Sequence, residues 1–249
     1  MNRFSKLKNY YNWGGRFLTD SYHLESKKLN DLEMAKRPFR YDVINFLLTT
    51  LNRECTYLEI GVRNPADNFN RIQATTKYSV DPGLEFKENP VDFVLTSDQF
   101  FDHLRAGKVL QTNIQFDVVF IDGLHTAEQV DRDIKNALEF IKEDGFIVLH
   151  DCNPPTESHA REEHNYEISP AMQNWNGTTW KGFMKWRNNS SVYSCTIDTD
   201  WGVGIISKSK RIGEHTTLTN EFFEFSVFHK RRQEYLNLIS FEDLKNLDI

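Results

Sequence analysis

The sequence predicts an α/β fold built on an open, doubly wound and mainly parallel β-sheet. Two observations lead to this fold class: short apolar runs that do not alternate with polar residues, and a helical stripe between two of those runs. Runs of Val, Ile, Leu and Phe without alternation are typical of parallel strands that are buried on both faces. The predicted strands lie at residues 56–60, 78–80, 93–95, 118–121 and 146–149.

The helices are predicted from apolar residues that recur at helical spacing. Such spacing occurs over residues 40–51 and again over residues 126–142, between the last two runs. Strand, helix and strand in this order indicate a βαβ unit. Further along, we expect a short helix at residues 178–188 and two strands at 192–197 and 203–207.

The chain divides into three predicted parts: a helical N-terminal extension at residues 1–38, a core domain at 39–208 and a helical C-terminal tail at 209–249. Within the core, residues 152–177 contain three prolines and show no periodicity. A connection of this length without periodicity is typical of a binding loop or a lid.

The composition limits the class of protein. Of the 249 residues, 39% are hydrophobic and the formal net charge is −6, so a folded core is expected and a basic nucleic-acid footprint is not. The three cysteines do not form a disulfide framework, which indicates a reducing, cytoplasmic location. No apolar stretch approaches about 18 residues, so we expect no membrane partner.

Each predicted parallel strand is followed or ended by an acidic residue. Ligands of open α/β sheets bind at the carboxyl ends of the strands, so these carboxylates are expected at one edge. A single acid at such a place often only caps a helix, but five in series favour a ligand site. The five residues are Glu59, Asp81, Asp98, Asp122 and Asp151.

The first strand loop distinguishes between nucleotide ligands. A dinucleotide fingerprint needs three glycines, and here Gly61 alone is in place. Glu59 would repel a pyrophosphate but suits a ligand with an ammonium group. Asp81 lies where a ribose-binding carboxylate is expected. A nucleoside with a cationic amino-acid tail, S-adenosylmethionine, therefore fits better than NAD.

Four sequence motifs carry a resemblance to a known family. The stretches LEIGVR (58–63), SVDP (79–82), FIDGLH (120–125) and VLHDC (148–152) resemble the motifs of class I S-adenosylmethionine-dependent methyltransferases. The branch that they resemble includes bacterial small-molecule and sugar O-methyltransferases. The resemblance covers roughly residues 40–207 and implies a Rossmann-like, seven-stranded sheet whose last strand is antiparallel.

The resemblance also implies a set of cofactor-binding residues. Glu59 and Gly61 would line the methionine part, with Arg63 where a second glycine is usual. Asp81 would bind the ribose, and Ser97 and Asp98 would lie beside the adenine. The full predicted set is Glu59, Gly61, Arg63, Asp81, Ser97, Asp98 and Asp122.

Several relatives hold a divalent metal by carboxylates after the fourth and fifth strands. Asp122 and Asp151 match those positions, with His150 or Asn153 as further ligands. Mg²⁺ takes oxygen ligands and lowers the pKa of a substrate hydroxyl, whereas the imidazole of His150 would favour a transition metal. The alternative is that both carboxylates only cap helices and order loops.

His125 resembles the catalytic base of sugar-modifying relatives, with Asp122 as the second predicted catalytic residue. A histidine with an ordinary pKa near 6.5 could take a hydroxyl proton at neutral pH. The alternative is a histidine at a helix entry that only bonds the backbone. The predicted activity is methyl transfer to a small-molecule or sugar hydroxyl, and a homo-oligomer is left open. Two other functions remain: a non-catalytic S-adenosylmethionine-binding module and a hydroxylase-like enzyme.

Overall fold

The computed structural model describes residues 3–85, 88, 90–164 and 169–249, and it is built around a seven-stranded sheet of order β2-β1-β3-β4-β6-β5-β7. The strands are β1 Thr56–Ile60, β2 Thr76–Val80, β3 Phe116–Ile121, β4 Ile141–Leu149, β5 Tyr193–Ile197, β6 Val203–Ser207 and β7 Leu238–Ile239. Strands β1 to β4 run parallel to one another. Strand β6 is antiparallel to both of its neighbours, β4 and β5. The predicted fold class is confirmed: the antiparallel strand is β6, the last strand of the predicted core domain, whereas β7 of the tail pairs in parallel with β5.

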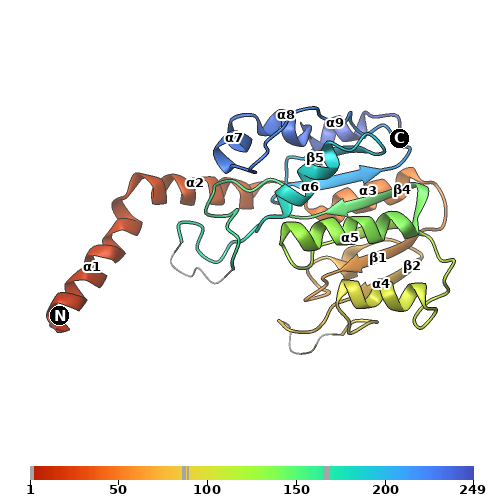
Figure 1. Cartoon of the computed structure of the whole chain (residues 1–249), viewed down its shortest axis with the longest axis horizontal. Helices are drawn as coiled ribbons and strands as arrows, with labels where there is room; N and C mark the ends of the chain where they lie inside the picture. Colours follow the sequence, from red (N-terminus) through yellow and green to blue (C-terminus); the bar gives the residue numbers. More distant parts are fainter. Residues whose placement is uncertain (1–2, 86–87, 89, 165–168) are drawn as a thin grey trace.

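Helices cover both faces of this sheet (Figure 1). Successive side chains of β1 point to opposite faces of the sheet. Leu58 packs into the layer of α4, α5 and α6, whereas Tyr57 packs against α3. The helices are α1 Arg3–Thr19, α2 Ser21–Ala35, α3 Arg40–Thr50, α4 Ser97–Arg105, α5 Ala127–Phe140, α6 Thr179–Arg187, α7 Phe225–Lys230, α8 Arg232–Leu236 and α9 Phe241–Lys245, with the 3-10 turn η1 at Phe69–Arg71. Strands buried on both faces explain the apolar runs of the sequence.

The predicted strand at residues 93–95 is wrong. In the described chain this segment makes one isolated bridge, between Phe93 and Val80. The carboxylate of Asp92 accepts the backbone N–H of Ser79 at 2.9 Å, so a side chain takes the place of a ladder partner. Thr96 then caps α4 and turns the chain into a helix. The seventh strand is instead β7, at the opposite edge of the sheet.

The C-terminal tail contains three short helices, α7, α8 and α9, and the strand β7. Asn237 adopts a left-handed conformation, with φ of 44°. Helix α8 ends there and the chain continues as β7. The predicted division at residues 38/39 and 208/209 stays a prediction. The predicted lid-like loop also stays one; its residues 165–168 lie outside the described residues, and its described remainder contains neither helix nor strand.

Helices α1 and α2 form an arm that leaves the body of the molecule (Figure 1). Helix α2 is anchored by two buried side chains, Ser26 and Glu33, whereas the described side chains of α1 are exposed. No helix of the described chain is both long and apolar enough to cross a membrane.

Candidate active site

The loops after β1 and β3 approach each other closely at the carboxyl edge of the sheet. Ile60 pairs with Ile121, so Gly61 and Asp122 follow two adjacent strands. Gly61 has φ of +83°, and a side-chain carbon there would lie 2.4 Å from the backbone oxygen of Asp122. The glycine is therefore required by both conformation and space.

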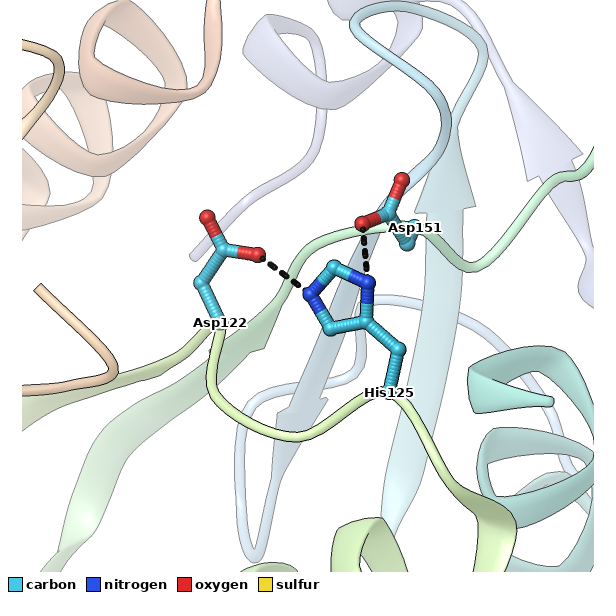
Figure 2. Close-up of side chains that lie close together, drawn as sticks. All are labelled: Asp122, His125 and Asp151. Atoms are coloured by element: carbon cyan, nitrogen blue, oxygen red, sulfur yellow. Dashed lines mark ion pairs between the residues drawn. The ribbon is translucent and has the colours of Figure 1, made fainter. Parts of the chain in front are cut away.

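The imidazole of His125 lies between two carboxylates (Figure 2). Its Nε2 is 3.3 Å from Asp122 Oδ1, and its Nδ1 is 3.2 Å from Asp151 Oδ2. Asp122 follows β3 and Asp151 follows β4, so the parallel register of the two strands brings the acids together. This triad, Asp122, His125 and Asp151, joins three predicted site residues.

Gly177 and Thr178, just before α6, contact the backbone of the loop that carries His125. The His125 carbonyl accepts the backbone N–H of Thr178 at 2.8 Å, and a side-chain carbon at Gly177 would lie 2.1 Å from the same oxygen. Thr178 Oγ1 accepts the N–H of Ala127 at 2.7 Å and so satisfies the first turn of α5. The ring of His125 also stacks on Trp175, with centroids 5.3 Å apart.

His150 lies beside the triad and contacts the same two carboxylates. Its Nδ1 is 3.3 Å from Asp122 Oδ1 and 3.2 Å from Asp151 Oδ2. The second oxygen of Asp151 accepts a hydrogen bond from Asn176 Nδ2 at 2.7 Å. The predicted ligand Asn153 is directed elsewhere, with its amide nitrogen 3.2 Å from Asp198.

Two charged residues near the triad escaped the sequence-based prediction. Arg40, at the start of α3, lies with Nε 3.7 Å from Asp122 Oδ2, and its Nη1 is 3.2 Å from Asp200 Oδ2. Asp200, in the β5–β6 turn, is also 3.5 Å from His150 Nε2. Neither residue belongs to a motif, and no local pattern distinguishes them from surface charges.

The charges of the cluster shift one another's protonation. Burial alone would lower the pKa of His125, but the carboxylates of Asp151 and Asp122 raise this pKa to about 9. The pKa of His150 is raised well above its ordinary value by the same two acids, again against the effect of burial. Burial opposes ionisation of Asp122, but His150 and His125 hold the pKa of its carboxyl below the usual range. The expectation of an ordinary His125 pKa is therefore not met.

The donor atoms of the cluster fit a divalent cation. Asp122, His125 and Asp151 each offer one ligand atom, and these atoms lie within 4.8 Å of one another. His150 Nδ1 faces the same oxygens of Asp122 and Asp151. Carboxylate oxygen and imidazole nitrogen together suit a transition metal better than Mg²⁺.

The predicted cofactor residues Gly61, Arg63 and Asp81 lie close together in the structure. Asp81 Oδ2 accepts the backbone N–H of Arg63 at 2.8 Å, and its Oδ1 accepts that of Gly83 at 2.7 Å. Arg63 has φ of 49°, so it takes up a left-handed conformation where the resembling family has a glycine. The loop thus keeps a glycine-like path despite the substitution.

Glu59 is buried, with only 1% of its surface exposed. Its carboxylate accepts hydrogen bonds from Tyr57 at 2.6 Å and from Asn68 at 2.8 Å. Burial raises the pKa of Glu59 to about 7, against the effect of these two donors. This acid is therefore only partly ionised at neutral pH in the ligand-free chain.

Ser97 and Asp98 begin α4 and face α5. Gln129 donates to Ser97 Oγ at 3.0 Å and to Asp98 Oδ1 at 3.3 Å. Arg132 is also 3.4 Å from Asp98 Oδ2. Both residues thus lie in the layer of helices α4, α5 and α6, at the start of the helix that follows β2.

The chain has an open α/β sheet of the kind in which ligands bind at the carboxyl ends of the parallel strands, and the triad lies at that edge. A family model described as a methyltransferase domain matches residues 49–152, which contain β1 to β4 and the triad. Residues 49–152 therefore resemble a methyltransferase domain, which agrees with the predicted resemblance to class I S-adenosylmethionine-dependent methyltransferases. No match was found among curated proteins.

Solved structures with similar architecture include two bacterial O-methyltransferases. The enzyme from Bacillus cereus, in complex with SAH, is 15% identical, with 76% of this chain and 90% of that chain covered and a TM-score of 0.43. TomG from Streptomyces achromogenes, involved in tomaymycin synthesis and in complex with SAM, is 11% identical, with 76% and 90% covered and a TM-score of 0.44. These likenesses are distant, with TM-scores of 0.43 and 0.44.

Proposed function

We propose that this methyltransferase moves the methyl group of S-adenosylmethionine to a hydroxyl oxygen of a small molecule or sugar. The observation that carries the proposal is the triad: an imidazole between Asp122 and Asp151, next to the loop of Gly61. An imidazole held between two acids at the ligand edge of the sheet is a stronger base than a free imidazole, and in its neutral form it can accept a proton from an alcohol.

On the donor side, Asp81 is proposed to bind the ribose hydroxyls, next to Gly61 and Arg63. Glu59 would face the methionine end and would be ionised most readily when an ammonium group approaches it, since its pKa is raised only to about 7. Ser97 and Asp98 would lie beside the adenine. These roles follow the resemblance, and the proximity of Arg63 and Asp81 supports them.

On the acceptor side, the hydroxyl oxygen forms a bond to the methyl carbon while the carbon–sulfur bond breaks, which leaves S-adenosylhomocysteine. The hydroxyl proton passes to the neutral ring of His125, and Asp122 and Asp151 stabilise the resulting imidazolium. A divalent cation held by Asp122, Asp151 and a histidine would lower the pKa of the acceptor hydroxyl. The stacking of Trp175 holds the ring of His125 in its plane.

We also propose a cytoplasmic location, because Cys55, Cys152 and Cys195 are all buried and free. The absence of nucleic-acid and membrane partners, and a homo-oligomer, stay predictions.

The experiment is an acceptor screen with S-adenosylmethionine labelled in its methyl group. Sugars, phenols and other alcohols are offered in turn, and labelled product and S-adenosylhomocysteine are measured together. We expect acceptor-dependent formation of both in equal amounts. Binding of S-adenosylmethionine without turnover on any alcohol would favour a non-catalytic module, and product oxidised rather than methylated would favour hydroxylase-like chemistry.

The same assay tests the cation. If the carboxylates hold a divalent ion, excess EDTA abolishes transfer and added Mn²⁺ or Mg²⁺ restores it. Full activity in EDTA would show that Asp122 and Asp151 act on His125 and the substrate directly.

A further inference from the structure

The turn between β5 and β6 has an unusual backbone at three successive residues. Asp200, Trp201 and Gly202 all have positive φ, of 43°, 65° and 88°. Left-handed conformations cost free energy for residues with a side chain, and they persist where the surrounding structure enforces them. This backbone turns the carboxylate of Asp200 inward, where the residue is only 7% exposed.

The two oxygens of Asp200 contact different parts of the chain. Oδ2 accepts the backbone N–H of Arg40 at 2.8 Å and lies 3.2 Å from Arg40 Nη1. Oδ1 lies 3.5 Å from Nε2 of His150. Asp200 therefore joins the first residue of α3 to the residue that follows β4.

We propose that Asp200 is a positioning residue that orients the ring of His150. The two nitrogens of an imidazole lie on different edges of the ring, so an acid that holds Nε2 also sets the direction of Nδ1. Nε2 of His150 lies 3.5 Å from Asp200 Oδ1 and 3.5 Å from Nη1 of Arg40, which Asp200 itself binds. With Nε2 on this side, Nδ1 of His150 faces Asp122 and Asp151, at 3.3 and 3.2 Å. Asp200 thus acts on the triad through His150, without touching it.

Arg40 completes the arrangement. Its guanidinium lies between Asp200 and Asp122, so it neutralises the positioning acid and one acid of the triad at once. Asp200 is buried, and without this counter-charge its ionised form would be costly. The functional part of the inference rests on the proposed function, whereas the orientation of His150 is a property of the resting protein.

The first test is Asp200→Asn, with Asp198→Asn as the matched control. Asparagine tolerates the left-handed conformation and keeps the size of the side chain, but it removes the charge. Asp198 lies in the same turn and contacts Lys36 and Asn153 instead of His150. We expect kcat to fall about 10–100-fold in Asp200→Asn, with Kd for S-adenosylmethionine unchanged and Asp198→Asn like the wild type. Melting temperatures of both variants show whether they fold.

A double-mutant cycle separates positioning from a general structural role. If Asp200 acts through His150, adding Asp200→Asn to His150→Ala lowers kcat no further than His150→Ala alone. If the two losses multiply, Asp200 acts independently of His150 and the inference is overturned.

Nitrogen-15 NMR of the histidine rings gives a readout without substrate, with His150→Ala used to identify the His150 signals. We expect Asp200→Asn to change the ring shifts of His150, and Asp198→Asn to leave them as in the wild type. His150 shifts that do not respond to Asp200→Asn would overturn the inference, even in an active enzyme. Shifts that respond in a protein without transfer activity would uphold the orientation and count against the proposed function instead.

Discussion

His125 has two carboxylate oxygens and the Trp175 carbonyl within 3.3 Å of its ring nitrogens. A ring that only bonded the backbone would not need two acids. We therefore expect His125→Ala to lower kcat by about 10²–10⁴-fold, the usual range for a lost general base, with little change in S-adenosylmethionine affinity. Turnover, Kd and melting temperature are measured on the same preparation.

The control for this substitution is His164→Ala. The ring of His164 packs against Trp175, the residue on which His125 stacks, with centroids 5.1 Å apart and the two planes tilted by 31°. We expect this variant to keep near wild-type turnover. If His125→Ala keeps wild-type turnover, His125 is not the group that removes the proton.

The pH dependence of transfer follows from the raised pKa of His125. A base must be neutral to act, and Asp151 and Asp122 raise the pKa of His125 to about 9 despite its burial. If transfer persists in EDTA, its rate should therefore rise with pH and level off above about 9. Added Mn²⁺ should move the inflection to lower pH, because a cation at the same carboxylates competes with the proton. A rate in EDTA that is flat between pH 6 and 9 would argue against His125 as the base.

Asp81 makes a separate prediction for the donor side. Its two oxygens order the backbone at Arg63 and Gly83, and the proposed ribose contact uses the same carboxylate. Removing a charged hydrogen-bond partner costs about 1.5–3 kcal/mol, so Asp81→Ala should raise Kd for S-adenosylhomocysteine about 10–100-fold. Titration calorimetry measures this, with Asp92→Ala as a control near the same strand end. An unchanged Kd would remove Asp81 from the cofactor site.

At the scale of elements, helix α2 holds the loop that carries Asn176 and Trp175. His159 of that loop is fully buried, with Nδ1 2.8 Å from Thr156 Oγ1 and Nε2 3.3 Å from Asn30 Oδ1 of α2. Asn30 Oδ1 also accepts a hydrogen bond from Asn174 Nδ2 at 2.5 Å. The N-terminal arm therefore contributes to the surroundings of the triad.

This contact predicts a loss of stability in acid. Burial lowers the pKa of His159 to about 4, whereas the unfolded chain has the ordinary value near 6.5. Between these two pKa values the unfolded state binds more protons than the folded state. The free energy of unfolding therefore decreases as the pH is lowered, by at most about 1.4 kcal/mol per pH unit. The stabilisation by neutral His159 is fully present above about pH 6.5 and decreases as the pH is lowered toward 4.

Urea unfolding of the wild type and of His159→Gln between pH 4 and 7 measures this effect. The difference in unfolding free energy between the two proteins should shrink as pH falls. A difference that stays constant over this range would show that His159 does not titrate with folding.

At the scale of the whole molecule, α1 is the element with least support from the rest of the chain. Phe4, Tyr11 and Leu18 are 79%, 82% and 77% exposed. We expect removal of residues 1–19 to change the free energy of unfolding by no more than about 0.5 kcal/mol, the range of surface changes. Removal of residues 1–38 should cost far more, because it takes away Asn30 and the buried Glu33 as well. Equal stability of the two truncated chains would contradict this role of α2.

The sequence by itself determined the fold class, the parallel strands that carry the candidate site, and the resemblance to methyltransferases. Strands β1, β3 and β4 are buried on both faces, so their sequences are apolar runs that can be recognised without the structure. The residues that follow these strands form contiguous motifs. Gly61, Asp81, Asp122 and Asp151 were all predicted at strand ends for this reason. The strand at 93–95 was wrong because three apolar residues do not show whether a backbone carbonyl or the Asp92 carboxylate will accept the N–H of Ser79.

Only the tertiary structure decided how these residues meet. The position of the His125 ring between two acids depends on the register of β3 and β4 and on Gly177, more than fifty residues further along the chain. Arg40 and Asp200 are separated by 160 residues in the sequence and meet beside His150. Such contacts carry no periodicity and no motif, because a charge pair depends on distance in space. That distance is set by the packing of α3 and the β5–β6 turn against the same edge of the sheet.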